Sequence, residues 1–449
     1  MSPREQVLEP PRAWLTWLLS YGVQRQSLRL AARRGDLIAR LSTDPELVAD
    51  PFAGYEELRA RGTFASNGLV RATVDHAACN EILRSDDFGT AAGHAELPPV
   101  LRGLLGRLQD PDSLGPVDPP SMLVVDPPEH TRYRKQVARA FTARKVGRMA
   151  DRVESVAERL LDDLADSGRA GGGDPVDLVD RYAAQLPVAV IADLLGVPED
   201  ERDQVLAWGN EAAVTLDPDL SWRRYRQADR ALREMHRWFH GHVQRLRRDP
   251  GEDLLSQVIL ADGDGDDPLT DTELHQVGLL VLGAGFETTV NLIGNGVAQL
   301  DAHPDQLRWL QQHPDGWGNA VEEVLRYDSP VQLTLRAAHR DVEVAGVPIA
   351  AGDGILTMLG GANRDPAVFA DAQSFDVTRS NAADHVAFSA GAHYCLGASL
   401  ARLEATVALR QLYERFPDLS VAGRPERRDT RVLRGYEHLP VATGARAAA

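Results

Sequence analysis

The feature that most restricts the fold of this chain is a stretch of about thirty residues without proline near its middle. It opens at Thr270-Asp-Thr-Glu273, which matches a capping box, and continues to Ala302, just before His303-Pro304. At 1.5 Å per residue, a helix over this stretch is roughly 45 Å long, enough to cross a whole domain. Such a helix needs a large body around it, so we predict one large, mostly helical unit.

The composition excludes several functional classes. The 449 residues carry a formal net charge of −17, and because nucleic-acid binding depends on clustered cations, we expect no nucleic-acid partner. Only Cys79 and Cys395 are present, which leaves no disulfide framework or CxxC zinc site and fits a reducing cytoplasm. The apolar run from Ala13 to Val23 is about half the length needed to cross a bilayer, so we expect no membrane anchor.

Hydrophobic periodicity predicts a fold that is mainly α with a small β portion. Helical repeats recur at 149–167, 187–195, 199–214, 222–248 and 306–312, while strand-like stretches are short, as in Val342–Ile349. Residues 1–48 form an Arg-rich extension, either a helix packed on the body or a mobile arm. Residues 49–449 are expected to form a single catalytic domain that is large enough to bury a cofactor.

Cys395 lies in the most distinctive motif of the chain, Phe388-Ser-Ala-Gly391-Ala-His393-Tyr-Cys395-Leu-Gly397. A helix is predicted from Leu396 to Glu414, and its first N–H groups would stabilise a thiolate. A thiolate ligand pushes electron density onto haem iron and favours cleavage of the O–O bond. Gly391 and Gly397 have no Cβ, so the backbone could turn sharply and approach a flat macrocycle. The alternative is a lone buried cysteine before a helix.

This motif resembles the haem-binding signature of the cytochrome P450 superfamily, the haem-thiolate monooxygenases, with Cys395 as the iron ligand. The resemblance runs from about Asp50 to the C-terminus, and the chain is similar to the soluble bacterial members. It implies the cytochrome P450 fold, with haem b between a long central helix and the cysteine-bearing loop. Ser389 stands where the family usually has glycine, so we expect altered hydrogen bonding near the loop without loss of haem.

The resemblance assigns further residues to the cofactor and to catalysis. The central helix contains Gly283-Ala284-Gly285-Phe286-Glu287-Thr288, and two glycines there are costly unless haem, oxygen and substrate must approach the backbone. Glu287 and Thr288 resemble the acid–alcohol pair that supplies protons for O–O cleavage. The alternative is an N-cap or surface cluster, which the mid-helix position disfavours. Residues that match cofactor-binding positions are His130, Arg134, Arg336 and His393 for the propionates, with Ala284, Phe388, Gly391 and Gly397 around the ring.

Glu323-Val-Leu-Arg326 matches the ExxR helix of the family. In that setting the ion pair is expected to be buried near the thiolate loop. We expect a residue of the segment from Asn363-Arg-Asp-Pro366 to Phe375-Asp376 to join it. Because removal of one partner would leave an uncompensated buried charge, we expect such a variant to fail to hold haem.

The predicted activity is insertion of one oxygen atom from O2 into an apolar organic substrate, by hydroxylation or epoxidation. The family resemblance implies external electron donors, a ferredoxin and its NAD(P)H-dependent reductase, with Arg402 and Arg410 as candidate docking cations on a monomer. Pocket walls are expected from Leu280, from Val331 and Leu333 in the strand after the ExxR helix, and from the loop Phe88–Pro119. These apolar stretches suit products of secondary metabolism such as terpenoids, steroids, fatty acids or polyketides equally. A peroxide-driven peroxygenase or isomerase and a haem-dependent sensor are the alternatives.

Overall fold

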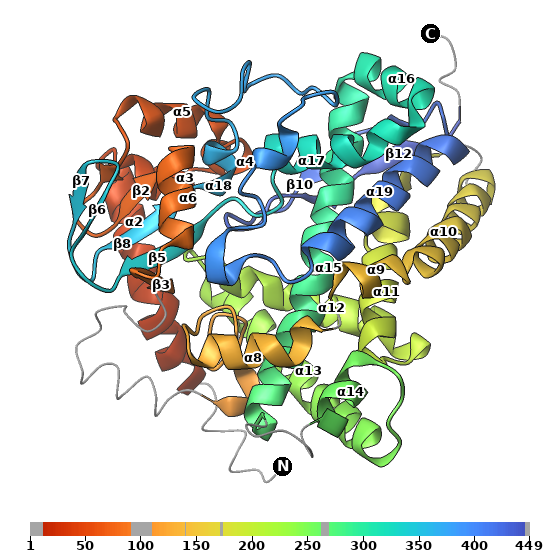
Figure 1. Cartoon of the computed structure of the whole chain (residues 1–449), viewed down its shortest axis with the longest axis horizontal. Coiled ribbons are helices and arrows are strands. Elements are labelled where there is room, and N and C mark those ends of the chain that lie inside the picture. Colours follow the sequence, from red (N-terminus) through yellow and green to blue (C-terminus); the bar gives the residue numbers. More distant parts are fainter. Residues whose placement is uncertain (1–11, 91–109, 140, 171–173, 262–268, 445–449) are drawn as a thin grey trace.

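The computed structural model describes residues 12–90, 110–139, 141–170, 174–261 and 269–444. Most of the loop Phe88–Pro119 that the sequence assigns to the pocket therefore lies outside the described residues. The fold is mainly α with a small β portion, as predicted (Figure 1). The α-helices are α2 (Val23–Arg33), α3 (Leu37–Thr43), α4 (Pro45–Ala49), α5 (Phe52–Ala60), α6 (His76–Arg84), α8 (Glu129–Ala138), α9 (Ala143–Gly147), α10 (Ala150–Ala170), α11 (Gln185–Leu195), α12 (Arg202–Ala213), α13 (Trp222–Arg248), α14 (Leu254–Ala261), α15 (Asp271–Ala302), α16 (Pro304–Gln312), α17 (Trp317–Tyr327), α18 (Leu359–Ala362) and α19 (Ala398–Arg415).

The long central helix is α15, and its start is the predicted capping box. The Thr270 hydroxyl accepts a hydrogen bond from the Glu273 N–H at 3.3 Å, and a Glu273 carboxylate oxygen accepts from the Thr270 N–H at 2.8 Å. The helix crosses the middle of the body and packs against α11, α12, α13 and α19 (Figure 1). Most of its side chains lie in the main hydrophobic core, which explains why so apolar a helix forms inside a globular chain.

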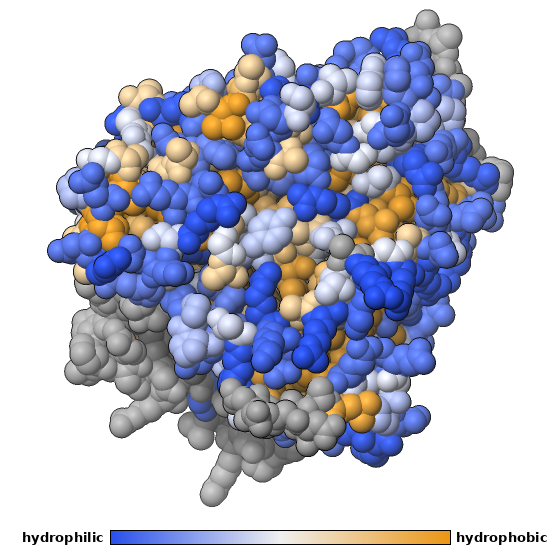
Figure 2. Space-filling model, in the orientation of Figure 1, coloured by the Kyte–Doolittle hydropathy of each residue, from blue (hydrophilic) through white to orange (hydrophobic). Residues whose placement is uncertain are grey.

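The described part of the chain contains one helix that is long and apolar enough to cross a membrane, and this helix is α15. However, 72% of its most apolar window is buried inside the protein. The visible face of the molecule is mostly hydrophilic, with apolar side chains in separate patches (Figure 2). The hydrophobicity of α15 is therefore accounted for by core packing.

The largest sheet of the β portion has five strands, in the order β1-β2-β8-β5-β3, and lies to one side of the helical body. Among the described residues, a three-stranded sheet β4-β12-β9 and the pairs β6-β7 and β10-β11 complete the β portion. β2 and β8 are parallel and the other pairs are antiparallel. The predicted strand Val342–Ile349 is a two-stranded hairpin with its turn at Ala345-Gly346. The strands are β1 (Ala65–Ser66), β2 (Arg71–Thr73), β3 (Phe88–Thr90), β4 (Val176–Asp177), β5 (Thr334–Ala338), β6 (Val342–Val344), β7 (Val347–Ile349), β8 (Gly354–Thr357), β9 (Ser420–Val421), β10 (Glu426–Arg427), β11 (Tyr436–His438) and β12 (Pro440–Ala442).

The described part of the Arg-rich extension is helical and packed on the body. Residues 12–33 are helical throughout, with a π-helical turn at Leu18–Gly22. Leu37, Ile38 and Leu41 of α3 belong to the same hydrophobic cluster as Tyr55 and Leu58 of α5. Of the two possibilities that the sequence leaves open, the structure thus selects a packed helix for residues 12–33.

Candidate active site

Cys395 lies at the end of a tight loop that begins at Phe388 and leads into α19. The Cys395 N–H donates to the Phe388 carbonyl at 2.9 Å and closes the loop. Gly391 has φ +66°, and a Cβ at this position would overlap with the Leu83 carbonyl at the end of α6. Only glycine meets both conditions, because L side chains disfavour this region of φ and the contact leaves no space. The loop is therefore positioned by direct backbone contact with α6.

The surroundings of the Cys395 sulfur combine desolvation with positive charge. Protein atoms surround the sulfur although the side chain keeps an exposed surface. Burial raises the pKa of the thiol, whereas the Gly397 N–H and the guanidinium groups of Arg134 and Arg402 lower it. The N–H and the two cations favour the thiolate, which is the form that binds metal ions.

Ser389 adopts a backbone conformation that suits glycine better. Its φ is +61°, and its buried hydroxyl has no hydrogen-bond partner in the described structure. This conformation destabilises the folded state by about 1–2 kcal/mol for a non-glycine residue. Ordering a glycine instead costs roughly 0.5–1 kcal/mol in chain entropy on folding. We therefore expect Ser389→Gly to raise the free energy of unfolding by up to about 1 kcal/mol in thermal or denaturant unfolding.

Ser389→Ala is the matched control for this prediction. It removes the unpaired hydroxyl but keeps the Cβ, so the gain of Ser389→Gly over Ser389→Ala measures the backbone strain alone. Equal stability of the glycine and alanine variants would contradict the interpretation.

Buried basic side chains gather beside the cysteine loop. His130 of α8 is 2% exposed, and its ring centroid lies 4.1 Å from that of His393 in the loop. Arg336 of β5 is 6% exposed and donates to the Thr334 hydroxyl at 2.8 Å and the Leu335 carbonyl at 3.0 Å. Among the described residues, no carboxylate lies within ion-pair distance of Arg134 or Arg336. The structure thus brings together all four residues that the sequence assigns to propionate binding.

The pKa shifts of this cluster indicate that its positive charges are not fully balanced by carboxylates. Burial lowers the pKa of both His130 and His393 to about 4, and nearby guanidinium groups add to the shift. Burial also lowers the pKa of Arg336 to about 10. The acid that opposes these shifts is Asp126, whose carboxylate lies 3.7 Å from the His393 ring nitrogen. The sequence analysis missed Asp126, although it stands four residues before His130.

The residues present fit a haem with a sulfur ligand. The guanidinium groups of the buried Arg336 and the half-buried Arg134, which have no carboxylate partners among the described residues, are suited to two propionates, which they can bind bidentately. Gly283 in α15 and Gly397 at the start of α19 both face open space, since a Cβ at either position would meet no protein atom within 4 Å. Ala284 is also exposed although it lies at the centre of a buried helix. These features leave room for a flat group between α15 and the cysteine loop.

Thr288 and Glu287 lie on different faces of α15. The Thr288 hydroxyl donates to the Ala284 carbonyl at 3.2 Å, and both residues border the exposed part of the helix. Glu287 is 4% exposed and points elsewhere, because successive helical residues are rotated by about 100°. Its carboxylate forms an ion pair of 2.7 Å with Arg428. Burial raises the pKa of Glu287, and Arg428 opposes that shift.

Arg428 belongs to a hairpin near the C-terminus, residues 426–438, that docks on a polar stripe of α15. The stripe consists of Glu287, Asn291, Asn295 and Gln299, spaced four residues apart in an otherwise apolar helix. Arg427 donates to the Asn295 side chain at 2.9 Å, and Gly435 leaves no room for a Cβ against Asn291. The sequence analysis missed these contacts, although the four-residue spacing of the stripe indicates a polar contact along one face.

Asp328 anchors the same hairpin from the end of α17. Its carboxylate accepts from Arg427 at 2.9 Å, from Arg434 at 2.7 Å and from Gln299 at 3.2 Å. Burial alone would raise the pKa of Asp328, but Arg427 and Arg434 outweigh it and hold the pKa below its ordinary value. The carboxylate is therefore ionised and ties α15, α17 and the hairpin together.

A second buried acid faces α15 from α19. Glu404 is 1% exposed, and burial raises its pKa well above the ordinary value, with the Thr289 side chain partly opposing the shift. Burial therefore favours the protonated form of this carboxyl group. Its position next to Thr289 shows that the glycine-containing part of α15 lies alongside the helix that starts beside Cys395.

The ExxR pair is fully buried and saturated with hydrogen bonds. Glu323 and Arg326 are both 0% exposed and form two contacts of 2.7 Å. Arg326 also donates to the carbonyls of Asn363, Ala372 and Ser374 at 2.9–3.0 Å, which uses all five of its N–H groups. Part of the expected segment does join the pair, through the Asn363 carbonyl and the Asp376 N–H. The third charged member is Arg379, 3.2 Å from Glu323 and three residues beyond that segment.

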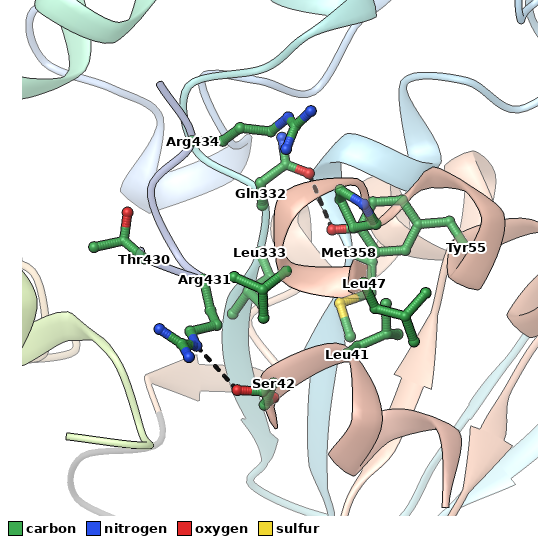
Figure 3. Close-up of a pocket in the computed structure, with 12 residues that line it drawn as sticks. Leu41, Ser42, Leu47, Tyr55, Gln332, Leu333, Met358, Thr430, Arg431 and Arg434 are labelled. Atoms are coloured by element: carbon green, nitrogen blue, oxygen red, sulfur yellow. Dashed lines mark hydrogen bonds between the residues drawn. The ribbon is translucent and has the colours of Figure 1, made fainter. Parts of the chain in front are cut away.

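The predicted pocket residues lie in different surroundings. Leu280 and Val331 are partly buried, the first against the main core and the second against a cluster near Ala390. Leu333 instead lines a small hollow between α3–α5 and residues 430–434 (Figure 3). The cavity volume there is about 20 Å³, room for about one water molecule. This hollow is too small for an organic substrate.

A loop that presents a cysteine at the start of a helix, beside a buried cationic cluster and opposite an opened central helix, defines a haem-thiolate protein. Comparison with known families agrees: the cytochrome P450 family model matches residues 113–315 and 318–433. The chain belongs to the cytochrome P450 family.

Known proteins resemble the chain over most of its length. It is 49% identical over 96% of its length to the putative cytochrome P450 140 of Mycobacterium tuberculosis, of which it covers 97%, so the match includes part of residues 1–48. It is 44% identical to 6-deoxyerythronolide B hydroxylase of Saccharopolyspora erythraea over 70% of this chain and 76% of that protein. The crystal structure of CYP164A2 from Mycobacterium smegmatis matches with a TM-score of 0.80 at 33% identity, over 90% of this chain and 99% of that chain.

The family membership establishes the reaction class. The protein is a haem-thiolate monooxygenase that binds haem b and inserts one oxygen atom of O2 into an apolar organic substrate. Electrons come from external redox partners and, through them, from NAD(P)H.

Proposed function

We propose that Cys395 would supply the sulfur ligand of the haem iron and that residues 49–449 form a single catalytic domain. The observation that carries the first proposal is Cys395 itself, an exposed residue at the end of the loop whose sulfur is faced by one N–H and two guanidinium groups. Haem with a thiolate ligand supplies activation of O2 by two electrons and protons. The absorption spectrum of the reduced carbon monoxide complex tests the assignment, since a Soret band typical of histidine ligation would refute it.

The basic cluster is proposed to bind the two propionates. Arg134 and Arg336 supply the permanent charges, and His130 and His393 complete the set. Because a bound carboxylate favours the protonated imidazole, anion binding should raise the depressed pKa values of both histidines. Phe388 forms part of the loop beneath the proposed ring position, where the Arg402 guanidinium lies 4.5 Å from its ring centroid.

Thr288 and Glu287 are proposed to supply protons at the open face of α15. Thr288 offers a hydroxyl at the exposed part of the helix, and Glu287 holds a proton-exchanging carboxylate one position away. Arg428 is a positioning residue, because its guanidinium lies 2.7 Å from the Glu287 carboxylate and opposes the rise in pKa that burial causes. A proton relay of this kind contributes typically 10²–10⁴-fold to a rate.

Thr288→Ala is expected to lower product formed per NAD(P)H consumed, while Thr288→Ser should restore it.

Arg428→Leu should raise the pKa of Glu287, because it removes the opposing cation. The loss of coupled turnover as pH is lowered should therefore occur at a higher pH than in the unaltered enzyme. The measurements are product and peroxide yields over a pH series. Full peroxide-supported turnover by Thr288→Ala would instead favour a peroxygenase.

The electron-donor surface is proposed to be the face that carries α8, α9 and the cysteine loop. The two predicted docking cations are engaged within the protein: Arg402 binds Glu322 at 2.5 and 3.0 Å, and Arg410 binds Glu154 at 2.9 Å. Exposed cations are instead found along α8 and the turn of α9, which Figure 2 shows as hydrophilic: Lys135, Arg139, Arg144 and Arg148. A ferredoxin with an acidic surface would suit this face.

Charge reversal at Lys135 and Arg139 together is expected to slow reduction by a ferredoxin by about tenfold or more at low salt, because steering depends on complementary charge. The loss should shrink as ionic strength rises. Arg237→Glu, an exposed arginine on α13, is the control and should leave the rate unchanged. Stopped-flow reduction followed by carbon monoxide binding measures the effect, and a salt-independent rate would contradict the proposed surface.

The substrate is proposed to be an apolar product of secondary metabolism in the cytoplasm, bound by a monomeric enzyme. Relatives that are 44% and 40% identical are named 6-deoxyerythronolide B hydroxylase and vitamin D(3) 25-hydroxylase. These two compounds are therefore suitable first probes in a spin-shift titration. A spin shift with neither compound would direct the search to other apolar classes.

A further inference from the structure

We propose that the N-terminal helix, residues 12–33, is a strap that holds the connection between α12 and α13 closed over the substrate pocket and so selects against bulky ligands. The connection comprises residues 214–221. The proposal rests on the proposed function and places the substrate between α15 and the helices α12 and α13, which contact it. No motif in the sequence analysis accounts for this segment.

Aromatic side chains form the first part of the contact. The Trp17 indole N–H donates to the Leu220 carbonyl at 3.0 Å, and its ring lies 5.6 Å from that of Trp222. One helical turn later, the Tyr21 hydroxyl donates to the Thr215 carbonyl at 3.0 Å, and its ring lies 5.8 Å from that of Tyr225. Two backbone carbonyls of the connection are thus satisfied by the strap, which fixes the connection at both ends.

Asp219 is the electrostatic centre of the contact. Its side chain is only 5% exposed and forms ion pairs with Arg25 at 3.0 Å and Arg29 at 3.3 Å, both from the strap. Arg431 of the hairpin near the C-terminus lies 4.0 Å away on another side. A buried carboxylate needs such partners to remain charged, so withdrawal of the strap would leave Asp219 poorly compensated. The strap therefore has a specific anchor and does not merely cover an apolar surface.

The opposite side of the connection is fixed as well. The buried carboxylate of Asp217 accepts hydrogen bonds from the Arg431 and Val432 N–H groups at 2.9 and 3.0 Å. Val432 in turn accepts from the Gln332 N–H at 2.8 Å, at the segment that leads into β5. The connection is thus held between the strap and the hairpin, and the contact that can be released without disturbing α15 is the strap.

The two helices joined by this connection, α12 and α13, pack directly on α15. Gly209 of α12 packs so closely on Phe286 that a Cβ would overlap with its ring, and Gly278 of α15 packs in the same way on Phe239 of α13. Movement of α12 and α13 relative to α15 therefore requires their connection to shift. Because the strap fixes that connection, it restrains movement of α12 and α13 relative to α15.

The test compares a large and a small iron ligand in the haem-loaded full chain. In the double variant R25Q/R29Q, association and dissociation of econazole should each become about three- to tenfold faster, while the rates for imidazole should change less than twofold. Econazole is a useful probe because the related CYP164A2 was crystallised with it bound. Hydrogen exchange should also become faster at residues 214–222 and stay unchanged in α19.

The matched control is R33Q/R34Q, which removes two exposed arginines at the end of the same helix that make no contact with the connection in the described structure. W17A removes the aromatic anchor and should reproduce the effect of R25Q/R29Q without a change in charge. Unchanged econazole rates and unchanged hydrogen exchange at residues 214–222 in both test variants would contradict the proposed role of the strap. Loss of the thiolate-type carbon monoxide spectrum in the unaltered enzyme would instead refute the proposed function, so the two failures are distinguishable.

Discussion

Replacement of Cys395 by serine is expected to abolish substrate oxidation. Serine cannot supply a soft anionic sulfur ligand, because a hydroxyl group ionises far less readily than a thiol. Loss of even an outer partner of a metal ligand costs about 10–100-fold, so loss of the ligand itself should exceed about 100-fold. The Soret band of the reduced carbon monoxide complex should move away from the thiolate position, and turnover with any accepted substrate should fall with it.

Cys79→Ser is the matched control for this experiment. Cys79 is the other cysteine in the chain, buried at 0% exposure in α6, and burial raises the pKa of its thiol. Its replacement should cost stability, as expected for a buried polar group, but it should leave the carbon monoxide spectrum unchanged. A Cys395→Ser variant that keeps both the thiolate spectrum and the activity would disprove the assignment.

Replacement of Arg326 by lysine is expected to have the largest effect on the structure. Arg326 makes two contacts of 2.7 Å with Glu323 and donates to three carbonyls, whereas lysine has three donors on a single nitrogen. At least two buried groups would lose their partners, at a cost of roughly 3–5 kcal/mol. Stability of most domains is only about 5–15 kcal/mol, so most of the variant should fail to fold and to retain haem.

The control is Arg61→Lys, which alters an exposed pair with Glu57 at 2.6 Å and should cost less than about 1 kcal/mol. Haem content per chain and the unfolding midpoint measure both variants. A double variant with Glu323→Gln should lose much less than the sum of the two single losses, because each removes the same network. Additive losses would show that Arg326 and Glu323 act independently.

The sequence allowed correct predictions of structure at positions where a residue type has a single physical role. The capping box at Thr270 and Glu273 predicted the start of α15. Gly391 was predicted to approach a macrocycle, but in the structure the space of its missing Cβ is taken by the Leu83 carbonyl of α6. The four basic residues beside the cysteine loop were found because they match family positions. Their convergence in space could not be derived from spacing alone, since they come from α8, β5 and the loop.

Other parts of the site depend on contacts between distant segments. Arg428 lies 141 positions after Glu287, and nothing in the local sequence of either residue indicates the other. The ion pairs of the candidate docking cations were not predicted for the same reason, since the acid partners of Arg402 and Arg410 lie on α17 and α10. Charged side chains reveal their partners only when the packing of helices is known.

The hairpin at residues 426–438 has a consequence for biosynthesis of the enzyme. A ribosome makes this segment after the elements that it contacts, among them α3, α13, α15 and the end of α17. Until it emerges, Glu287 and Asp328 have no arginine partners from this segment, and the carbonyl and carboxylate groups that it satisfies face water. The nascent chain can therefore form its helical body before Glu287 gains its ion pair with Arg428. Docking of the hairpin on α15 and Asp328 should be a late event in the folding of the enzyme.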